Sequence, residues 1–177
     1  MKEEHTIMES MTKEEWQAFL DAPARSAIIA TVREDGRPHA ATIWFAREGE
    51  RIVFTSWYTS VKVKNILRDG RVSLYFMVPG STISVRVNGM ARLTADTALC
   101  TRFQRDSKHP RTVIVIRVGE VYSQCARALQ RSALWSSGDL SAGLPSVGQM
   151  LQEASAGEID GAAYDAERAT RAHLGWW

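Results

Sequence analysis

The side chains best suited to chemistry lie between residues 55 and 64. Thr55, Ser56 and Ser60 supply hydroxyl groups ahead of a short segment with helical spacing, and Lys62 and Lys64 follow in its first turn. Cations at a helix N-terminus oppose the helix dipole, which favours negative charge there. Hydroxyl groups, free backbone N–H groups and ammonium groups together are typical of a phosphate site. The pattern therefore predicts that this turn holds the phosphate of a ligand.

The bulk composition excludes several other classes of function. The 177 residues carry a net charge of +2 that is spread along the chain, whereas nucleic-acid binding usually needs a clustered basic face. The two cysteines and four histidines form no metal motif, and we expect no metal. The first residues lack the apolar core of a signal peptide, and no apolar run is long enough to span a membrane. We therefore expect a cytoplasmic protein with neither a nucleic-acid nor a membrane partner.

Short strands separated by tight turns make up most of the chain up to residue 121. Turns containing Gly36 and Gly49 separate the first three strands, which is typical of an antiparallel meander. In the fifth strand, the alternation predicts that Ile83, Val85 and Val87 point into the interior. The order predicts a mainly β, α+β fold with six antiparallel strands closed into a small barrel. The expected strands are residues 26–32, 39–46, 51–56, 71–78, 82–93 and 111–121.

Helical patterns surround these strands. Thr12 and Glu15 have capping-box spacing and predict an N-terminal helix. The segment 60–68 places Val63, Ile66 and Leu67 on one helical face. After Tyr122 the pattern is helical again. We expect a barrel domain over residues 1–135, including the N-terminal helix, and a C-terminal helical extension over 136–177 that packs on the barrel or on a partner subunit.

Three stretches resemble a known family in the same order. They are ATVREDGRPHAATIWF (residues 30–45), SVKVKN with the following DGRV, and FMVPGSTISVRVNGMARL with VYSQCARALQRSALW. Over residues 24–135 the chain resembles the FMN-binding split barrels of the pyridoxamine 5'-phosphate oxidase-like superfamily. The last stretch is similar to a bacterial flavoprotein subgroup that ends in HCxKAxxRSxLW, with Gln124 and Arg127 in place of its His and Lys.

The resemblance implies a six-stranded antiparallel split β-barrel with peripheral helices that forms a homodimer, with a flavin at the subunit interface. It implies an FMN-dependent oxidoreductase acting on a small molecule. No residue of the chain is expected to act as a dedicated catalytic acid or base. Lys62 and Lys64, helped by Ser60 and Thr55, would hold the cofactor phosphate. The remaining residues expected to bind the cofactor are Ile43, Trp44, Phe45 and Ser56 along the edge of the flavin ring, Ser84 and Arg86 on one strand face, and Arg131 and Trp135 after the last strand.

Other functions stay open at this point. The segment SVKVKNILRDGRVSL is also similar to reductases that use the deazaflavin F-420, and some split barrels bind flavin or haem without catalysis. The C-terminal RATRAHLGWW lacks the Arg-Leu-His motif of authentic pyridoxamine phosphate oxidases. Arg131 and Trp135 are expected to share one helical face with Arg127. Their alternative role is only to pack that helix against the barrel or the partner chain. The substrate is not predicted.

Overall fold

The computed structural model describes residues 11–22, 26–104, 107, 109–124, 127–138, 140–167 and 170. The chain divides into two compact units, the first ending at Ser136 and the second beginning at Ser137. Cys125 and the terminal pair Trp176–Trp177 lie outside the described residues.

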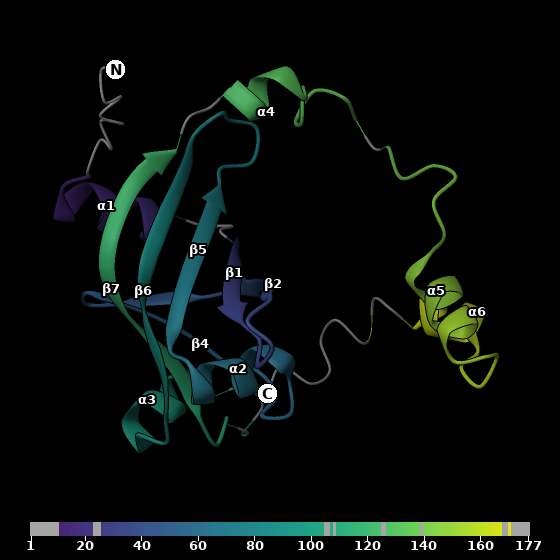
Figure 1. The fold of residues 1–177 in the computed structure, drawn as a ribbon, viewed down its shortest axis with the longest axis horizontal. Helices are drawn as coiled ribbons and strands as arrows, with labels where there is room; N and C mark the ends of the chain where they lie inside the picture. The colour runs from purple at the N-terminus through teal and green to yellow at the C-terminus, as the bar shows by residue number, and fades with distance from the viewer. Residues whose placement is uncertain are drawn as a thin grey trace. The chain divides into compact units, whose positions relative to one another are not determined.

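One curled antiparallel sheet forms the first unit (Figure 1). This confirms the predicted mainly β, antiparallel fold with peripheral helices, but the predicted number of six strands is wrong, because the sheet has seven. Their order across the sheet is β2-β1-β5-β6-β7-β4-β3. The strands are β1 Ser26–Val32, β2 Pro38–Trp44, β3 Ala46–Glu48, β4 Arg51–Phe54, β5 Arg71–Met77, β6 Ser84–Thr94 and β7 Val113–Gln124.

The additional strand arises where the chain changes neighbours at Phe45. Before this residue, Trp44 of β2 pairs with Ser26 of β1; after it, Ala46 of β3 pairs with Val53 of β4. The segment 39–46, predicted as one strand, is therefore two. Because β2 and β3 are the opposite edges of the sheet and only one residue joins them, the sheet must curl back on itself.

Alternate residues of the strands fill the interior of the curl, as a period of two requires. Leu74 and Phe76 of β5 and Val87 of β6 have no exposed surface. Val85 is also buried as predicted, but Ile83 is 58% exposed, because β6 begins only at Ser84. The prediction for Ile83 is wrong because the strand was expected to begin too early, and not because its side chains fail to alternate.

Four helices belong to the first unit within the described residues, and two to the second. They are α1 Lys13–Asp21, α2 Val61–Arg68, α3 Thr97–Arg102 and α4 Arg127–Arg131, then α5 Val147–Ala154 and α6 Gly161–Ala166. The predicted capping box of α1 is confirmed, since Thr12 and Glu15 bond reciprocally. None of the helices in the described ranges is long and apolar enough to cross a membrane.

The two helices of the second unit meet at glycines. A Cβ atom on Gly148 would lie 2.0 Å from the carbonyl oxygen of Gly161, so only a residue without a side chain allows this approach. Asp165 of α6 accepts a hydrogen bond from the backbone N–H of Gly148 at 2.9 Å. The unit is therefore held by close backbone contact and one charged cap.

Helix α2 packs on the sheet through a mixed apolar and polar face. Val63 and Ile66 are buried, and so is Asn65, whose Nδ2 donates to Oγ1 of Thr31 on β1 at 2.9 Å. Because the buried face includes Asn65, Leu67 is turned outward and is 55% exposed, contrary to the prediction. The Asn65–Thr31 hydrogen bond fixes the rotation of α2 against β1.

Replacing Asn65 with Ala removes the donor and leaves the buried Thr31 hydroxyl with one partner fewer. We expect the free energy of unfolding to fall by about 1–3 kcal/mol. Urea denaturation measures this change. Leu67→Ala on the same helix is the matched control, and we expect it to stay within about 0.5 kcal/mol of the unaltered protein because the side chain is exposed. Equal effects of the two substitutions would show that the hydrogen bond does not fix α2.

Candidate functional site

The two lysines of α2 lie in different environments because of helix geometry. A helix turns by about 100° per residue, which places Lys62 above Asn65 and Ile66 on the face packed against the sheet. Lys64 lies about 200° further round and is exposed. Lys62 is partly buried at the start of the helix. Only Lys62 is therefore placed among polar groups of the preceding loop.

Three side chains at this point form one hydrogen-bonded group, here called the serine–lysine cluster: Ser56, Ser60 and Lys62. The Nζ atom of Lys62 donates to Oγ of Ser56 at 3.2 Å, and the two serine Oγ atoms are 3.1 Å apart. Ser60 is the N-cap residue of α2, yet its side chain makes no capping bond to the helix. Its hydroxyl instead belongs to the cluster. Thr55, next in the loop, is 8% exposed.

Within the described residues, the charge of Lys62 has no carboxylate partner. Among the ion pairs of the residues that the structure describes, none includes Lys62, and the first turn of α2 contains no acidic residue. Burial lowers the pKa of the Lys62 ammonium group, because the charged form loses hydration. An anion beside the cluster would stabilise that charge and accept hydrogen bonds from the serine hydroxyl groups. The cluster therefore fits a phosphate group.

Lys64 lines a separate cavity of about 480 Å³ on the other side of the helix. Arg33 and Asp35 of the β1–β2 turn and Arg68 of α2 line the same cavity. Asp35 is held by Arg37, whose Nε donates to the carboxylate at 2.8 Å. The structure thus places Lys64 beside this turn and not in the serine–lysine cluster.

The residues predicted to line the edge of the flavin ring differ in their exposure. Ile43 is 8% exposed, and the Phe45 ring packs edge-on against Phe76 with a centroid distance of 5.1 Å. Their side chains belong to the core. These two residues could therefore contact a ligand through their backbone N–H and C=O groups. Trp44 is 40% exposed and lies against Phe103, 5.8 Å between ring centroids. Trp44 is therefore the side chain of the three that reaches the surface.

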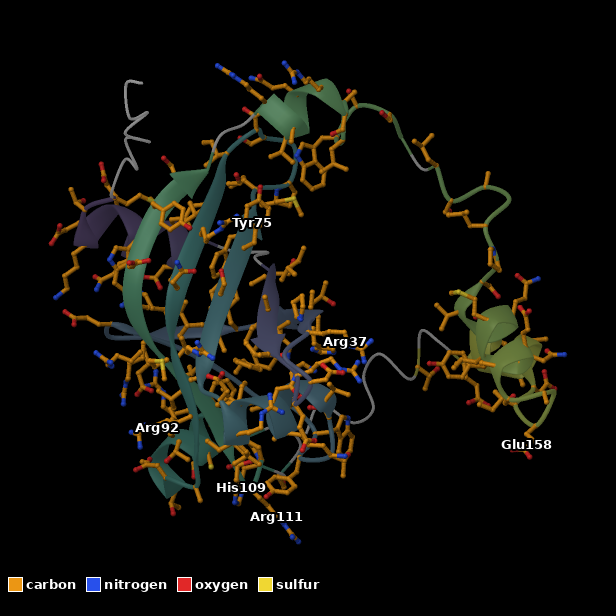
Figure 2. All side chains as sticks on the ribbon, in the orientation of Figure 1. Arg37, Tyr75, Arg92, His109, Arg111 and Glu158 are labelled. Carbon is orange, nitrogen blue, oxygen red and sulfur yellow. The ribbon has the colours of Figure 1, made fainter. Side chains whose placement is uncertain are left out.

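A second polar group lies on β6. Nη1 of Arg86 donates to the Tyr122 hydroxyl at 3.2 Å, and its guanidinium carbon lies 5.7 Å from the centre of that ring. Tyr75, labelled on β5 in Figure 2, is the cross-strand partner of Arg86 on the other side. No ion pair of Arg86 occurs among the described residues. Ser84, two residues earlier, is 1% exposed.

The segment after β7 differs from the expected helix. α4 ends at Arg131, and Ala133 has a φ of 48°, which breaks the helical path. Arg131 and Trp135 therefore do not share one helical face, contrary to the prediction. Arg131 is exposed, whereas Nε1 of Trp135 donates to the Ser81 carbonyl at 2.7 Å. This bond ties the segment to the loop before β6.

The predicted residues thus fall into separate groups. The structure brings Ser56, Ser60 and Lys62 together, whereas Arg86 bonds to Tyr122 and Trp135 bonds to the loop before β6.

Sequence reasoning missed three residues near these groups. Tyr122 lies 36 residues from its partner Arg86. His109 and Arg111 line a cavity with Ser56. None of the three has a local sequence signal, since each depends on strand register or loop path.

A metal centre has no support in the described part of the chain. No group of three or more His, Cys, Asp or Glu side chains there could hold a metal ion. The candidate site is accordingly one of hydroxyl, ammonium and guanidinium groups.

Comparison with solved structures identifies the fold. General Stress Protein 26 from Bacillus anthracis is 22% identical, over 62% of this chain and 91% of that chain, with a TM-score of 0.53. A protein named F420 Reductase is 24% identical, over 59% and 94% of the two chains, with a TM-score of 0.50. HupZ of Group A Streptococcus is 19% identical, over 64% and 94%, with a TM-score of 0.51. At these identities the likeness shows a shared fold only.

The sequence itself matches one family. No curated protein matches the chain significantly. The family described as pyridoxamine 5'-phosphate oxidase matches residues 12–125, which is more than half of the 177 residues and includes the serine–lysine cluster and Arg86. The curled antiparallel sheet described above agrees with this match. The chain belongs to the pyridoxamine 5'-phosphate oxidase family.

Proposed function

We propose that this protein is an FMN-dependent oxidoreductase that acts on a small molecule. The observation that carries the proposal is the serine–lysine cluster: a partly buried ammonium group without a carboxylate partner among the described residues, joined to a serine whose Oγ contacts a second serine. A phosphate monoester supplies the negative charge and the acceptor oxygens that this cluster lacks. Family membership supports a flavin as the molecule that carries the phosphate.

The flavin would supply the redox chemistry, accepting a hydride and passing electrons on. The residues of this chain would position it. Lys62, Ser56 and Ser60 would bind the phosphate, with Thr55 and Lys64 as further candidates. Arg86, held by Tyr122, presents a fixed positive charge that would stabilise a reduced anionic ring. No side chain is assigned as catalytic acid or base, and the remaining predicted cofactor contacts are Ile43, Trp44, Phe45, Ser84, Arg131 and Trp135.

The proposed active form is a homodimer with the flavin at the subunit interface. Large apolar side chains on the first unit support a covering partner, since Trp57 and Tyr58 are 58% and 63% exposed. Light scattering tests this proposal. We expect a mass close to twice the 19.7 kDa of one chain. A mass of one chain at micromolar concentration would contradict it.

The deazaflavin F-420 is the alternative cofactor, motivated by the resemblance of the segment 60–74 to enzymes that use it. A flavin or haem bound without catalysis is the other alternative. The absorption spectrum of the purified protein separates these cases, because flavin, deazaflavin and haem have different visible bands. We expect a flavin spectrum that bleaches on reduction. A flavin spectrum without turnover of any electron donor would favour the non-catalytic alternative.

Replacing Lys62 with Ala tests the phosphate assignment. A charge-assisted hydrogen bond contributes about 1.5–3 kcal/mol, so FMN affinity should fall roughly ten- to a hundredfold. Riboflavin, which lacks the phosphate, should lose much less. Fluorescence titration of the apoprotein with each flavin measures both affinities.

Two variants serve as comparisons. Lys64→Ala changes the same type of side chain on the same helix, but outside the serine–lysine cluster, and we expect a smaller loss of FMN affinity. Arg92→Ala, an exposed site on β6 that Figure 2 labels, should change neither affinity. If Lys62→Ala weakens FMN and riboflavin equally, Lys62 does not bind the phosphate.

A further inference from the structure

The second unit has no apolar core of its own within the described residues. In α5 and α6 only Gly148 and Gly161 are buried, and these are the glycines at which the two helices meet. Both cysteines of the chain precede residue 137, so no disulfide holds the unit, and its described side chains contribute to no metal-binding group. A unit of about 40 residues usually needs such a link, or contact with another surface, to stay folded.

One side of α5 presents large apolar side chains to solvent. Val147 and Met150 are 38% and 49% exposed, and Leu144, which precedes the helix, is 69% exposed. Val147 and Met150 are three residues apart and therefore share a helical face. Gly148, which contacts Gly161, lies about 100° further round the helix. The packing of α6 thus leaves uncovered a surface here called the α5 apolar face: Leu144, Val147 and Met150.

The charge of the second unit indicates what kind of surface fits it. Residues 137–177 contain six of the 20 acidic side chains of the chain but only two of its 22 basic ones, a net charge of −4. Residues 1–136 contain the other 14 acidic and 20 basic side chains, a net charge of +6. Nucleic acids and anionic membranes repel an acidic unit, whereas a basic barrel such as this one attracts it.

The connection to the second unit is long enough to reach another molecule. α4 ends at Arg131 and α5 begins only at Val147, whereas helix–helix connections in compact domains usually have about two to eight residues. The bond from Trp135 to the Ser81 carbonyl ties this connection to the first unit. The residues between Trp135 and Val147 span up to about 40 Å when extended, which exceeds the diameter of a small domain, about 30 Å.

We infer that the second unit docks through the α5 apolar face on the basic barrel of a second copy of this chain. In a two-fold dimer the exchange is reciprocal, so each pair of chains covers two such faces and forms two contacts between opposite charges. The inference rests on the proposed homodimer and adds to it a segment that holds the two chains together. It does not depend on which cofactor the barrel binds.

Photochemical cross-linking of the full-length protein tests the inference. Leu144 is replaced with the photoreactive residue benzoylphenylalanine, which keeps this position apolar, and irradiation joins it to the surface that it touches. We expect a covalent species of twice the 19.7 kDa of one chain on a denaturing gel. Mass spectrometry of its peptides should show position 144 joined to a residue between 1 and 136.

Substitutions on the α5 apolar face test the apolar part of the contact. Val147→Ser combined with Met150→Ser should lower the yield of the double-mass species roughly tenfold, because two large apolar side chains no longer become buried. Leu140→Ser is the matched control, since this leucine is exposed in the same unit but lies outside the α5 apolar face. We expect it to leave the yield unchanged.

Serine also weakens α5 itself, so the charges provide an independent test. Glu153 and Glu158, the latter labelled in Figure 2, are exposed and form no ion pair within the described residues. Glu153→Gln combined with Glu158→Gln should lower the yield at low salt and have little effect at high salt, where the attraction is screened. Glu34→Gln, which removes an exposed carboxylate from the barrel, should not lower it.

The outcomes separate the inference from the proposed homodimer. A cross-link within one chain, or one that joins two second units, would overturn the inference, while light scattering at twice the mass of one chain would leave the homodimer intact. A double-mass yield that neither pair of substitutions changes would also overturn it. A mass of one chain in light scattering, with no double-mass species after irradiation, would overturn both.

Discussion

A partly buried ammonium group, with no counter-ion among the described residues, is the constraint around which this end of the molecule is organised. Helix α2 must present Val63, Ile66 and Asn65 to the sheet, and this rotation places Lys62 on the packed face. Burial disfavours its charge, and the Ser56 hydroxyl offsets only part of that cost. A bound phosphate would remove the conflict. The site is thus a consequence of how the helix packs, and binding energy would compensate for a local cost of folding.

Much of the fold could be predicted from the sequence because its signals are local. The alternation in β5 and β6, the capping box at Thr12 and the turns with glycine each act over a few residues. The exchange of partners at Phe45 could not be predicted, because a strand of alternating residues looks the same whichever neighbour it pairs with. The exposure of Ile83 has the same origin, since the pairing of β6 with β5 sets where the strand begins.

The candidate site shows the same division between local and distant signals. Ser56, Ser60 and Lys62 lie within seven positions, so their spacing was sufficient to predict that they lie together, and their binding of a phosphate stays a prediction. Lys64 is also a lysine in the first turn of α2, yet the rotation of the helix places it beside another cavity. Arg86 and Tyr122 meet through the β6–β7 register, which no short motif encodes. The positive φ of Ala133 was unpredictable because alanine favours helix.

The central claim is that the charged form of Lys62 recognises a phosphate. The most direct test is the difference between FMN and riboflavin affinity, measured as the pH rises from 7. Because burial lowers the pKa of Lys62, its charge is lost, as the pH rises, at a value below that of an ordinary lysine. The advantage of FMN should decline over that range, and in Lys62→Arg, which stays charged, it should not. An FMN advantage that does not change with pH in the unaltered protein would contradict the claim.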